Sequence, residues 1–223
     1  MKRDLEVVSE PTPRRAPDGS PIELYKLLPT AGEPELIHRA IPAGATVLDL
    51  GCGVGRITHA LQALGHPVTA VDESSEMLAE VHGAEKVCAR IQDLDLGRTF
   101  DCVLLMSNLV NADGREELLR GCRRHVAAAG VVLIERMDPV PAWGSSSGEY
   151  GPFHIEVDLR ADGESLRGVV AYTLPDGRQW THRFGRGARI LDDRALAAEL
   201  ARAGLRLDRI VGRGRRWCAA RPA

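Results

Sequence analysis

Hydrophobic residues in this chain form short apolar runs that alternate with amphipathic stretches of helical period. In the first such unit an apolar run at 47–50 is followed by a glycine-rich turn. A segment at 57–64 comes next, with apolar residues at i, i+3, i+4 and i+7. Gly65 then stands where a left-handed helix cap belongs. The pattern predicts a strand, a turn and a helix, which together open a doubly wound α/β fold.

The same alternation continues as far as residue 137. It predicts further strands at 66–72, 87–89, 100–106 and 131–135. It also predicts helices at 22–28, at 33–41, after Ser74 or Ser75, and over 114–127. The run at 100–106 is apolar without alternation, as expected for a parallel strand that helices cover on both faces.

The pattern changes after residue 137. Residues 138–152 have no core periodicity and are predicted to form a long loop, a candidate lid because it follows the fifth strand. We predict an antiparallel β-meander within 153–187, because strand-like pieces there are separated by two Asp-Gly turns. A last helix after Asp192 or Asp193 and a hairpin of 205–211 with 217–220 end the pattern.

Composition limits the class of protein. The 223 residues are 44% hydrophobic, which suits a single domain over 21–223, with 21–41 as a helical cap and 1–20 as a flexible tail. A net charge of −2 argues against a nucleic-acid binder. The five cysteines form no Cys-x-x-Cys pair and are interpreted as reduced core residues. No apolar run could span a membrane and no secretory signal is visible, so we expect a cytoplasmic protein.

The glycine turn and the acid after the second strand carry the most specific signal. Gly51, Gly53 and Gly55 are spaced Gly-x-Gly-x-Gly, whereas dinucleotide-binding turns have two residues before the last glycine. Asp72 ends the second strand, where a carboxylate can accept both hydroxyls of a ribose. With Asp49 inside the motif, VLDLGCGVGR followed by VTAVDES resembles the class I S-adenosylmethionine-dependent methyltransferases. The resemblance covers roughly Glu35 to Met137 well, and the C-terminal third in layout only.

The resemblance implies an α/β fold of the Rossmann-like class I methyltransferase type. It implies a mostly parallel seven-stranded sheet with an antiparallel terminal hairpin, beside the inserted antiparallel β-meander. It also implies S-adenosyl-L-methionine as cofactor and S-adenosyl-L-homocysteine as its product. The cofactor-binding positions that it carries onto this sequence are Tyr25, Asp49, Gly51, Cys52, Gly53, Gly55, Arg56, Asp72, Glu73, Met77, Ile91, Gln92, Asp93, Met106, Ser107 and Asn108.

Two of these assignments have alternatives. The family usually has an Asp after the third strand to accept a hydrogen bond from the adenine amino group, but Arg90 stands there and has donors only. Gln92 or Asp93 is expected to replace it, with the backbone of Ile91 serving the ring nitrogen. Tyr25 matches a family aromatic that touches the methionyl end of the cofactor, and it could equally pack on the domain edge.

The acceptor side is expected where the fourth and fifth strands end. In the family the reactive methyl group meets substrate near 107–111. Candidate substrate residues are Asn108, Asn111, Trp143, Tyr150 and His154. Candidate general bases, needed only for a hydroxyl or ammonium acceptor, are His154, Tyr150 and His182. Each of these side chains also has a purely structural interpretation, such as an Asn that bonds its own turn backbone.

The function predicted is in-line methyl transfer to a small-molecule acceptor, without a metal and without nucleic acid. The Asp/Asn-Pro-Pro-Tyr/Phe signature of nucleic-acid amino methyltransferases is absent, since SNLVN follows the fourth strand. Alternatives are non-methylating chemistry on the same cofactor, such as cyclisation, or a cofactor-binding regulatory protein without turnover. Glycine spacing and the terminal hairpin disfavour a nicotinamide oxidoreductase. The acceptor, and the choice among oxygen, nitrogen and carbon, stay open, as does a homodimer formed through the meander.

Overall fold

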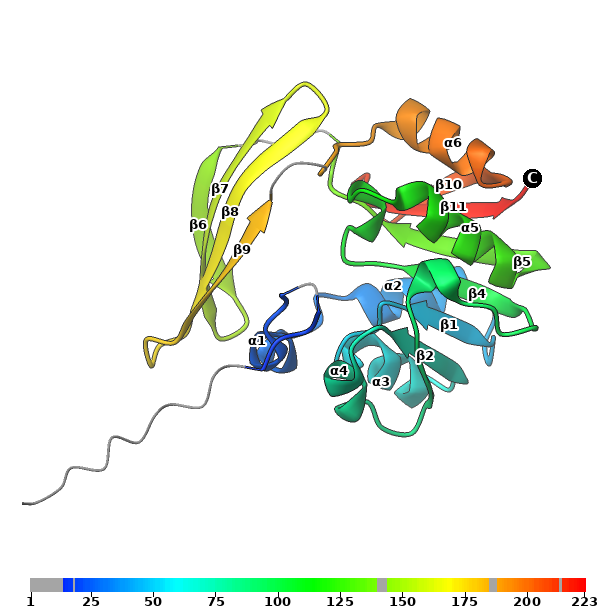
Figure 1. Cartoon of the computed structure of the whole chain (residues 1–223), viewed down its shortest axis with the longest axis horizontal. Coiled ribbons are helices and arrows are strands. Elements are labelled where there is room, and N and C mark those ends of the chain that lie inside the picture. The colour runs from blue at the N-terminus through cyan, green and yellow to red at the C-terminus, as the bar shows by residue number, and fades with distance from the viewer. Residues whose placement is uncertain (1–13, 18, 140–143, 185–187, 213) are drawn as a thin grey trace, which may run out of the picture.

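The apolar runs of the sequence pair into one seven-stranded sheet, and the later strands form a second sheet beside it (Figure 1). The computed structural model describes residues 14–17, 19–139, 144–184, 188–212 and 214–223. The large sheet has the order β10-β11-β5-β4-β1-β2-β3. Its strands are β1 (Val47–Leu50), β2 (Val68–Asp72), β3 (Glu85–Cys88), β4 (Phe100–Leu105), β5 (Val126–Glu135), β10 (Leu205–Val211) and β11 (Trp217–Pro222).

Strands β1 to β5 pair in parallel, while β11 is antiparallel to both β5 and β10. The predicted fold class, including the antiparallel terminal hairpin, is therefore confirmed. Leu50 is in register with Val71 and with Leu105, and Leu105 is in register with Ile134. The carboxyl ends of β1, β2, β4 and β5 consequently lie level along one edge of the sheet, where ligands of such folds bind.

Helices cover both faces of this sheet because its central strands β1, β4 and the second half of β5 are buried on both sides. The helices are α1 (Ile22–Leu27), α2 (Glu33–Ala40), α3 (Arg56–Ala63), α4 (Ser75–Ala79), α5 (Arg115–His125) and α6 (Asp193–Arg202), with two 3₁₀ turns, η1 (Ile91–Asp93) and η2 (Leu109–Asn111). Serine and aspartate caps start two of them as predicted: Ser74 accepts from the Met77 amide at 3.2 Å and Asp192 from the Ala195 amide at 2.7 Å.

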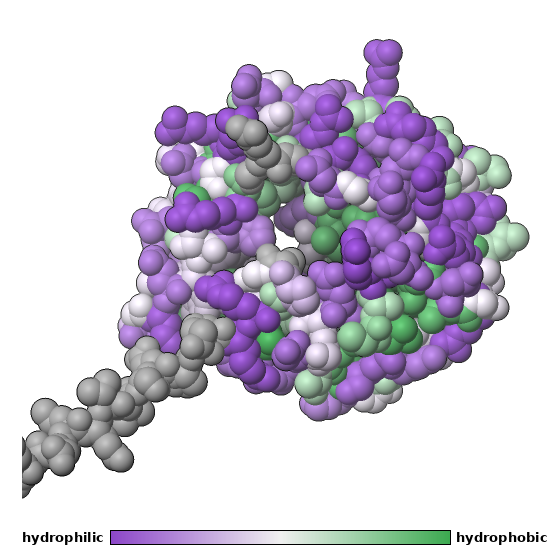
Figure 2. Space-filling view, viewed as in Figure 1, coloured by the Kyte–Doolittle hydropathy of each residue, from purple (hydrophilic) through white to green (hydrophobic). Residues whose placement is uncertain are grey.

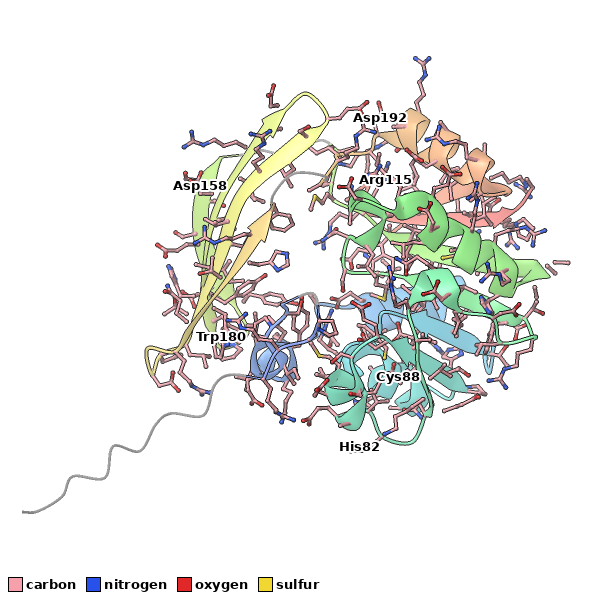
Figure 3. The ribbon with its side chains drawn as sticks, in the orientation of Figure 1. His82, Cys88, Arg115, Asp158, Trp180 and Asp192 are labelled. Atoms are coloured by element: carbon pink, nitrogen blue, oxygen red, sulfur yellow. The ribbon has the colours of Figure 1, made fainter. Side chains whose placement is uncertain are left out.

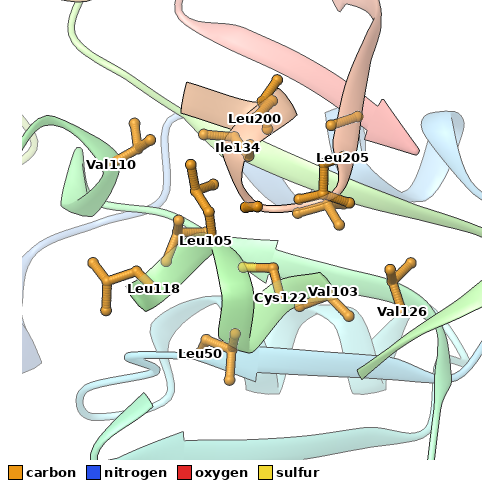
Figure 4. Close-up of a cluster of buried hydrophobic side chains, with 14 of the residues drawn as sticks. Leu50, Val103, Leu105, Val110, Leu118, Cys122, Val126, Ile134, Leu200 and Leu205 are labelled. Carbon is orange, nitrogen blue, oxygen red and sulfur yellow. The ribbon is translucent and has the colours of Figure 1, made fainter. Parts of the chain in front are cut away.

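The core has two halves, one on each face of the sheet. On one face the side chains of α5 and α6 pack against alternate strand residues (Figure 4), among them Leu50, Val103, Leu105, Leu118, Cys122 and Leu200. On the other face α2 and α3 pack Ile37, Ile57 and Leu61 against Val47, Leu104 and Leu133. Each fully buried side chain of this size stabilises the fold by about 1.5–3 kcal/mol relative to exposure.

The second sheet is antiparallel, in the order β6-β7-β8-β9. Its strands are β6 (Ser145–Tyr150), β7 (Phe153–Asp162), β8 (Ser165–Thr173) and β9 (Gln179–Phe184). The inserted sheet therefore has one strand more than the meander predicted over 153–187. That strand, β6, lies within 138–152, where the sequence predicts a loop, so this prediction is wrong for residues 145–150. The physical reason is that β6 is an exposed edge strand of Ser, Gly and Glu. It pairs with β7 through its backbone, which leaves no apolar periodicity in the sequence.

The inserted sheet (β6–β9) touches the rest of the molecule at two ends. At one end Leu159, Leu166 and Val170 pack with Met137, which follows β5. At the other end Phe153 and Leu174 pack with Leu24 of α1, and Trp180 lies against the same cluster (Figure 3). Between the two contacts the apolar face of the sheet stands over the edge of the large sheet.

The described part of the predicted N-terminal tail is packed. Ala16 is buried against Ile22, Val54 and Met77, and Arg14 forms ion pairs with acidic side chains of α1 and of the segment after α4. The composition of 1–20 does not reveal these contacts, because they need only one small apolar residue and one charge. Residues 1–13 and 18 lie outside the described residues.

Two further expectations concern the cysteines and the membrane. All five cysteines are free, as predicted, but Cys88 is exposed at the end of edge strand β3 and is not a core residue. In the part of the chain that the structure describes, no helix has the length and apolarity needed to cross a bilayer.

Candidate functional site

Two cavities adjoin at the carboxyl ends of β1, β2 and β4. The first, of about 370 Å³, lies between this edge and the inserted sheet. The second, of about 280 Å³, lies beside β2 and η1. They share Tyr25, Gly51, Gly53 and Ser107 as lining residues. Figure 2 shows the molecular surface hollowed between the inserted sheet and the large sheet. The arrangement is one cleft with two chambers.

The glycine turn forms the wall between the chambers. Gly51, Gly53 and Gly55 have φ of 73°, 55° and 82°, in the left-handed region that side chains rarely adopt. A Cβ on Gly51 would stand 2.9 Å from Leu109 Cδ1. A Cβ on Gly53 would meet no atom within 4 Å, since the backbone there faces open space. The turn thus exposes bare backbone to a ligand, and Gly55 itself begins α3 without lining either cavity.

Asp72 lies in the second cavity, directly beside this turn. Its Oδ2 accepts from the Gly53 amide at 2.8 Å and its Oδ1 from the Ser74 amide at 2.9 Å. A carboxylate has about four lone-pair positions, and these two bonds occupy two of them. Glu73 and Met77 line the same chamber. An acid fixed in this way suits a ligand with two adjacent hydroxyl groups.

The far wall of the second cavity is formed by Ala89, Arg90, Ile91 and Gln92. The Arg90 side chain is 61% exposed and lies 3.8 Å from the Glu73 carboxylate. Of the two predicted substitutes for a family Asp, Gln92 lines the cavity, whereas Asp93 is exposed and does not.

Beside the glycine turn, the wall of the first cavity contains a buried acid and an arginine. Asp49 is 2% exposed, and its Oδ2 accepts from the Thr58 hydroxyl at 2.7 Å. Burial raises the pKa of Asp49 to about 6, against the Thr58 hydrogen bond and the charge of Arg56, which lower it. Arg56 donates to the Pro29 carbonyl at 3.0 Å and to the Glu33 carboxylate at 2.9 Å. A carboxylate and a guanidinium on one wall can hold a zwitterionic amino-acid group.

The exit of β4 is a strained turn on the floor of the first cavity. Ser107 and Asn108 have φ of 54° and 59°, and among the described residues no other non-glycine residue has a positive φ. Such conformations cost of order 1–3 kcal/mol each and occur mainly where function requires them. Asn108 Oδ1 is buried without a hydrogen-bond partner. Most buried polar atoms in proteins have a hydrogen-bond partner, so this oxygen is a candidate acceptor for a group bound in the cleft.

An ion pair supports this turn from the neighbouring strand. Glu135, at the end of β5, accepts from the Ser107 amide at 3.0 Å and from Arg216 Nη2 at 2.6 Å. The Glu135 side chain is 6% exposed, and both residues line the first cavity. The sequence pattern does not distinguish Glu135, because this residue ends an apolar strand. It does not single out Arg216 because an arginine-rich turn resembles an ordinary solvated surface.

The inserted sheet supplies the roof of the first cavity, formed by Tyr150, Ile155, Tyr172, His182 and Phe184. Burial raises the pKa of Tyr172. Tyr25, Tyr150 and Tyr172 all line this cavity. The His182 ring lies 4.8 Å from the Phe184 ring. The roof is therefore mainly aromatic, with one imidazole in it. The predicted residues Tyr150 and His182 both belong to it, whereas Tyr172 and Phe184 were not anticipated.

His154 is not brought to the cleft. It lies on β7 between Phe153 and Ile155, whose side chains face the large sheet, so its own side chain faces the opposite side. There its Nδ1 lies 2.9 Å from Glu149 Oε1. Asp158, which shares this outer face by strand alternation, points away from the cleft in Figure 3. Period-two alternation within 153–160 could have identified this from the sequence.

Two other predicted acceptor residues also lie elsewhere. Asn111 is 1% exposed and lines neither cavity. Its Oδ1 accepts from the Met137 amide at 2.8 Å and its Nδ2 donates to the Arg189 carbonyl at 2.6 Å, so it ties η2 to two other segments. Trp143 falls outside the described residues. The predicted cofactor-binding residues, by contrast, line the two cavities with the exceptions of Gly55 and Asp93.

Tyr150 also links the inserted sheet to the segment that follows α1. Its hydroxyl donates to the Pro29 carbonyl at 3.0 Å, the same oxygen that Arg56 contacts. We expect Tyr150→Phe to lose this bond while keeping the ring, which lowers the free energy of unfolding by about 0.5–1.5 kcal/mol. Urea titration measures the loss. An unchanged Tyr150→Phe midpoint would contradict the assignment of this bond.

Comparison with known proteins identifies a family and several relatives. A family model described as a methyltransferase domain matches residues 48–134. The ubiquinone biosynthesis O-methyltransferase of Xanthomonas axonopodis pv. citri (strain 306) is 30% identical over 205 residues, or 87% of this chain and 76% of that protein. Its counterpart from Xanthomonas oryzae pv. oryzae (strain PXO99A) is 34% identical over 110 residues, 45% of this chain and 46% of that one.

Among solved structures, the chain resembles S-adenosylmethionine-bound CalS10, an amino pentose methyltransferase from Micromonospora echinaspora involved in calicheamicin biosynthesis. The TM-score is 0.66 at 22% identity, covering 86% of this chain and 89% of that one. At this identity the likeness shows a common fold.

Proposed function

Because the chain belongs to the class I S-adenosylmethionine-dependent methyltransferases, we propose that it methylates a small organic acceptor held beneath the inserted sheet. The observation that carries the proposal is the pair of adjoining chambers. One has the glycine turn and Asp72 in its walls, and the other has an aromatic roof over the exits of β4 and β5. The relatives support methyl transfer and not the cyclising or regulatory alternatives considered from the sequence.

The residues present fit S-adenosyl-L-methionine. Bare backbone at Gly53 allows close approach, and Asp72 offers oxygens for the two ribose hydroxyls. Gln92 and the backbone of Ile91 stand where an adenine would lie. Asp49 suits the ammonium of the amino-acid end, and Arg56 suits its carboxylate. When bound, the cofactor supplies a methyl group that its sulfonium has already activated for transfer.

The chain's own part in the reaction is to orient the acceptor and exclude water. Aromatic side chains of the roof give a large apolar surface for an organic acceptor, while the floor at Ser107 and Asn108 offers polar groups. Holding two reactants in line can lower a barrier by about 7–11 kcal/mol. This requires no covalent nucleophile, and among the described residues no group of His, Cys, Asp and Glu could hold a metal ion.

A proton must leave when the acceptor is a hydroxyl or an ammonium. His182 is the imidazole that lines the first cavity, so we assign it the role of proton acceptor. Tyr150 is less suited, since burial and the charge of Glu33 raise its pKa and its proton is donated to the Pro29 carbonyl.

The experiment that tests the function is transfer of a labelled methyl group. We expect the protein with methyl-labelled S-adenosylmethionine to move label into the small-molecule fraction of a cell extract. His182→Ala should lower the rate by about 10²–10⁴-fold if the acceptor needs a base, whereas His154→Ala should not change it. Label that stays in the cofactor, or enters nucleic acid, would refute the proposal.

A further inference from the structure

We propose that Glu135 is a positioning residue for methyl transfer, which acts by holding the Ser107–Asn108 turn at the cavity floor. The inference rests on the proposed function, because it concerns the same cleft. Glu135 is not on the segment that it would control. It reaches across from the end of β5 to the exit of β4, and its Oε2 accepts the Ser107 amide at 3.0 Å.

The turn requires such support because its conformation is unfavourable without it. Ser107 and Asn108 are consecutive left-handed residues, and neither is glycine. Serine in particular gains nothing from this conformation. An amide that points at a fixed carboxylate is held in place by a charge-assisted hydrogen bond. The turn therefore depends on a side chain from a neighbouring strand.

The support is itself fixed. A buried carboxylate is costly unless it is paired, and Arg216 supplies the pairing through Nη2 at 2.6 Å. Arg216 in turn lies in the segment before β11, whose backbone is tied to β5 because the Arg216 carbonyl accepts from the Arg136 amide at 2.8 Å. The terminal hairpin, β5 and the β4 exit are thus joined in one network at the floor of the cavity.

The network has a consequence for the reaction. Met106, Ser107 and Asn108 line the first cavity beneath the aromatic roof, where the acceptor is proposed to lie. A change in the φ angles of Ser107 would move Asn108 and its amide relative to the roof. The glycine turn and Asp72 would stay in place, since they are held by β1 and β2. Ser107 and Asn108 are only part of the surface predicted to bind the cofactor, so loss of Glu135 should lower turnover more than it weakens cofactor binding.

A purely structural ion pair would behave differently, and the chain offers a matched example. Glu199 on α6 is also nearly buried, with a side chain 10% exposed and 2.6 Å from Arg202, but it lines neither cavity. Glu199→Ala therefore measures the effect of removing a nearly buried carboxylate, and with it an ion pair to an arginine, outside the cleft.

The experiment compares Glu135→Ala, Glu135→Gln, Glu135→Asp and Glu199→Ala in three assays. Calorimetry gives the Kd of S-adenosylhomocysteine, labelled transfer to the extract fraction gives kcat and KM, and amide hydrogen exchange of the ligand-free protein reports on Ser107. A misplaced group can cost on the order of a hundredfold in rate. We expect Glu135→Ala to lower kcat by about that factor, with faster Ser107 exchange and a smaller change in Kd.

Further variants separate the hydrogen bond from Glu135 to the Ser107 amide from the negative charge of Glu135, and test the conformation of Ser107. Glu135→Gln keeps an oxygen for the Ser107 amide and should retain most of kcat and the slow exchange. Ser107→Gly in the Glu135→Ala background should recover part of kcat, because glycine adopts the left-handed conformation unaided. If the alanine variant does not fold, Glu135→Asp carries the same test, because its shorter side chain keeps the charge and withdraws the oxygen from Ser107.

The proposal is overturned if Ser107 exchange is unchanged in Glu135→Ala, if kcat falls no further than in Glu199→Ala, or if the glutamine variant is as slow as alanine. A failure of the proposed function is recognised separately. In that case the wild-type protein transfers no label, while the exchange assay on the ligand-free protein still decides whether Glu135 holds the turn.

Discussion

Replacing Asp72 with Ala should weaken the binding of S-adenosylmethionine by about ten- to hundredfold while the protein stays folded. The variant leaves two ribose hydroxyls without a charged acceptor, and a hydrogen bond to a charged group contributes about 1.5–3 kcal/mol. It also frees the Gly53 amide, which Asp72 now holds at 2.8 Å. Both effects act on the same chamber, so calorimetric titration with S-adenosylmethionine measures their sum.

Asp93 provides the matched control for this prediction. It is an aspartate in the neighbouring η1 segment, but it is exposed and lines neither cavity. Asp93→Ala should therefore bind the cofactor as tightly as the wild-type protein. Equal affinities for wild-type protein and Asp72→Ala would show that the ribose lies elsewhere, and a weak Asp93→Ala variant would restore the role that the sequence suggested for Asp93.

Cofactor affinity should also fall steeply as the pH drops below 6. Burial raises the pKa of Asp49 to about 6, so in the ligand-free protein this carboxyl is half protonated near that pH. An ammonium group pairs with the ionised form only. Binding must then release a proton, and affinity should fall by up to about tenfold for each pH unit below 6. Calorimetry in buffers of different ionisation enthalpy detects the released proton.

The stability of the ligand-free protein should change in the opposite direction. Because the folded pKa lies above the ordinary value of 3.8, the contribution of Asp49 is fully present below that value and is lost as the pH rises through 6. Asp49→Asn should remove both trends and weaken cofactor binding at pH 7.5. If wild-type affinity is flat between pH 5 and pH 7, Asp49 does not pair with the ligand's ammonium group.

The sequence could predict the large sheet because local signals and tertiary contacts agree there. Strands such as 100–106 are apolar on both faces, helix caps such as Ser74 stand at the right places, and the glycine spacing fixes the turn. The carboxyl ends of β1, β2, β4 and β5 are level, so the residues that follow them lie together at one edge of the sheet. For that reason most of the residues predicted to bind the cofactor, from Asp49 to Asn108, line the cleft.

The acceptor half could not be predicted in the same way. Its residues come from distant strands, and their direction depends on register and alternation rather than on composition. His154 illustrates this, since one position along β7 separates the cleft face from the outer face. Glu135 illustrates it too, because its importance depends on a contact with Ser107 across two strands. Strand β6 was missed because backbone pairing alone holds it at the sheet edge.

The measurement that tests the central claim most directly is a crystal structure of the protein with S-adenosylhomocysteine. The account predicts the ribose hydroxyls on Asp72, the adenine beside Ile91 and Gln92, and the amino-acid end between Asp49 and Arg56. The sulfur should face the first cavity, beneath Tyr172, His182 and Phe184. A ligand whose sulfur faces away from this cavity, or that binds outside both chambers, would contradict the account.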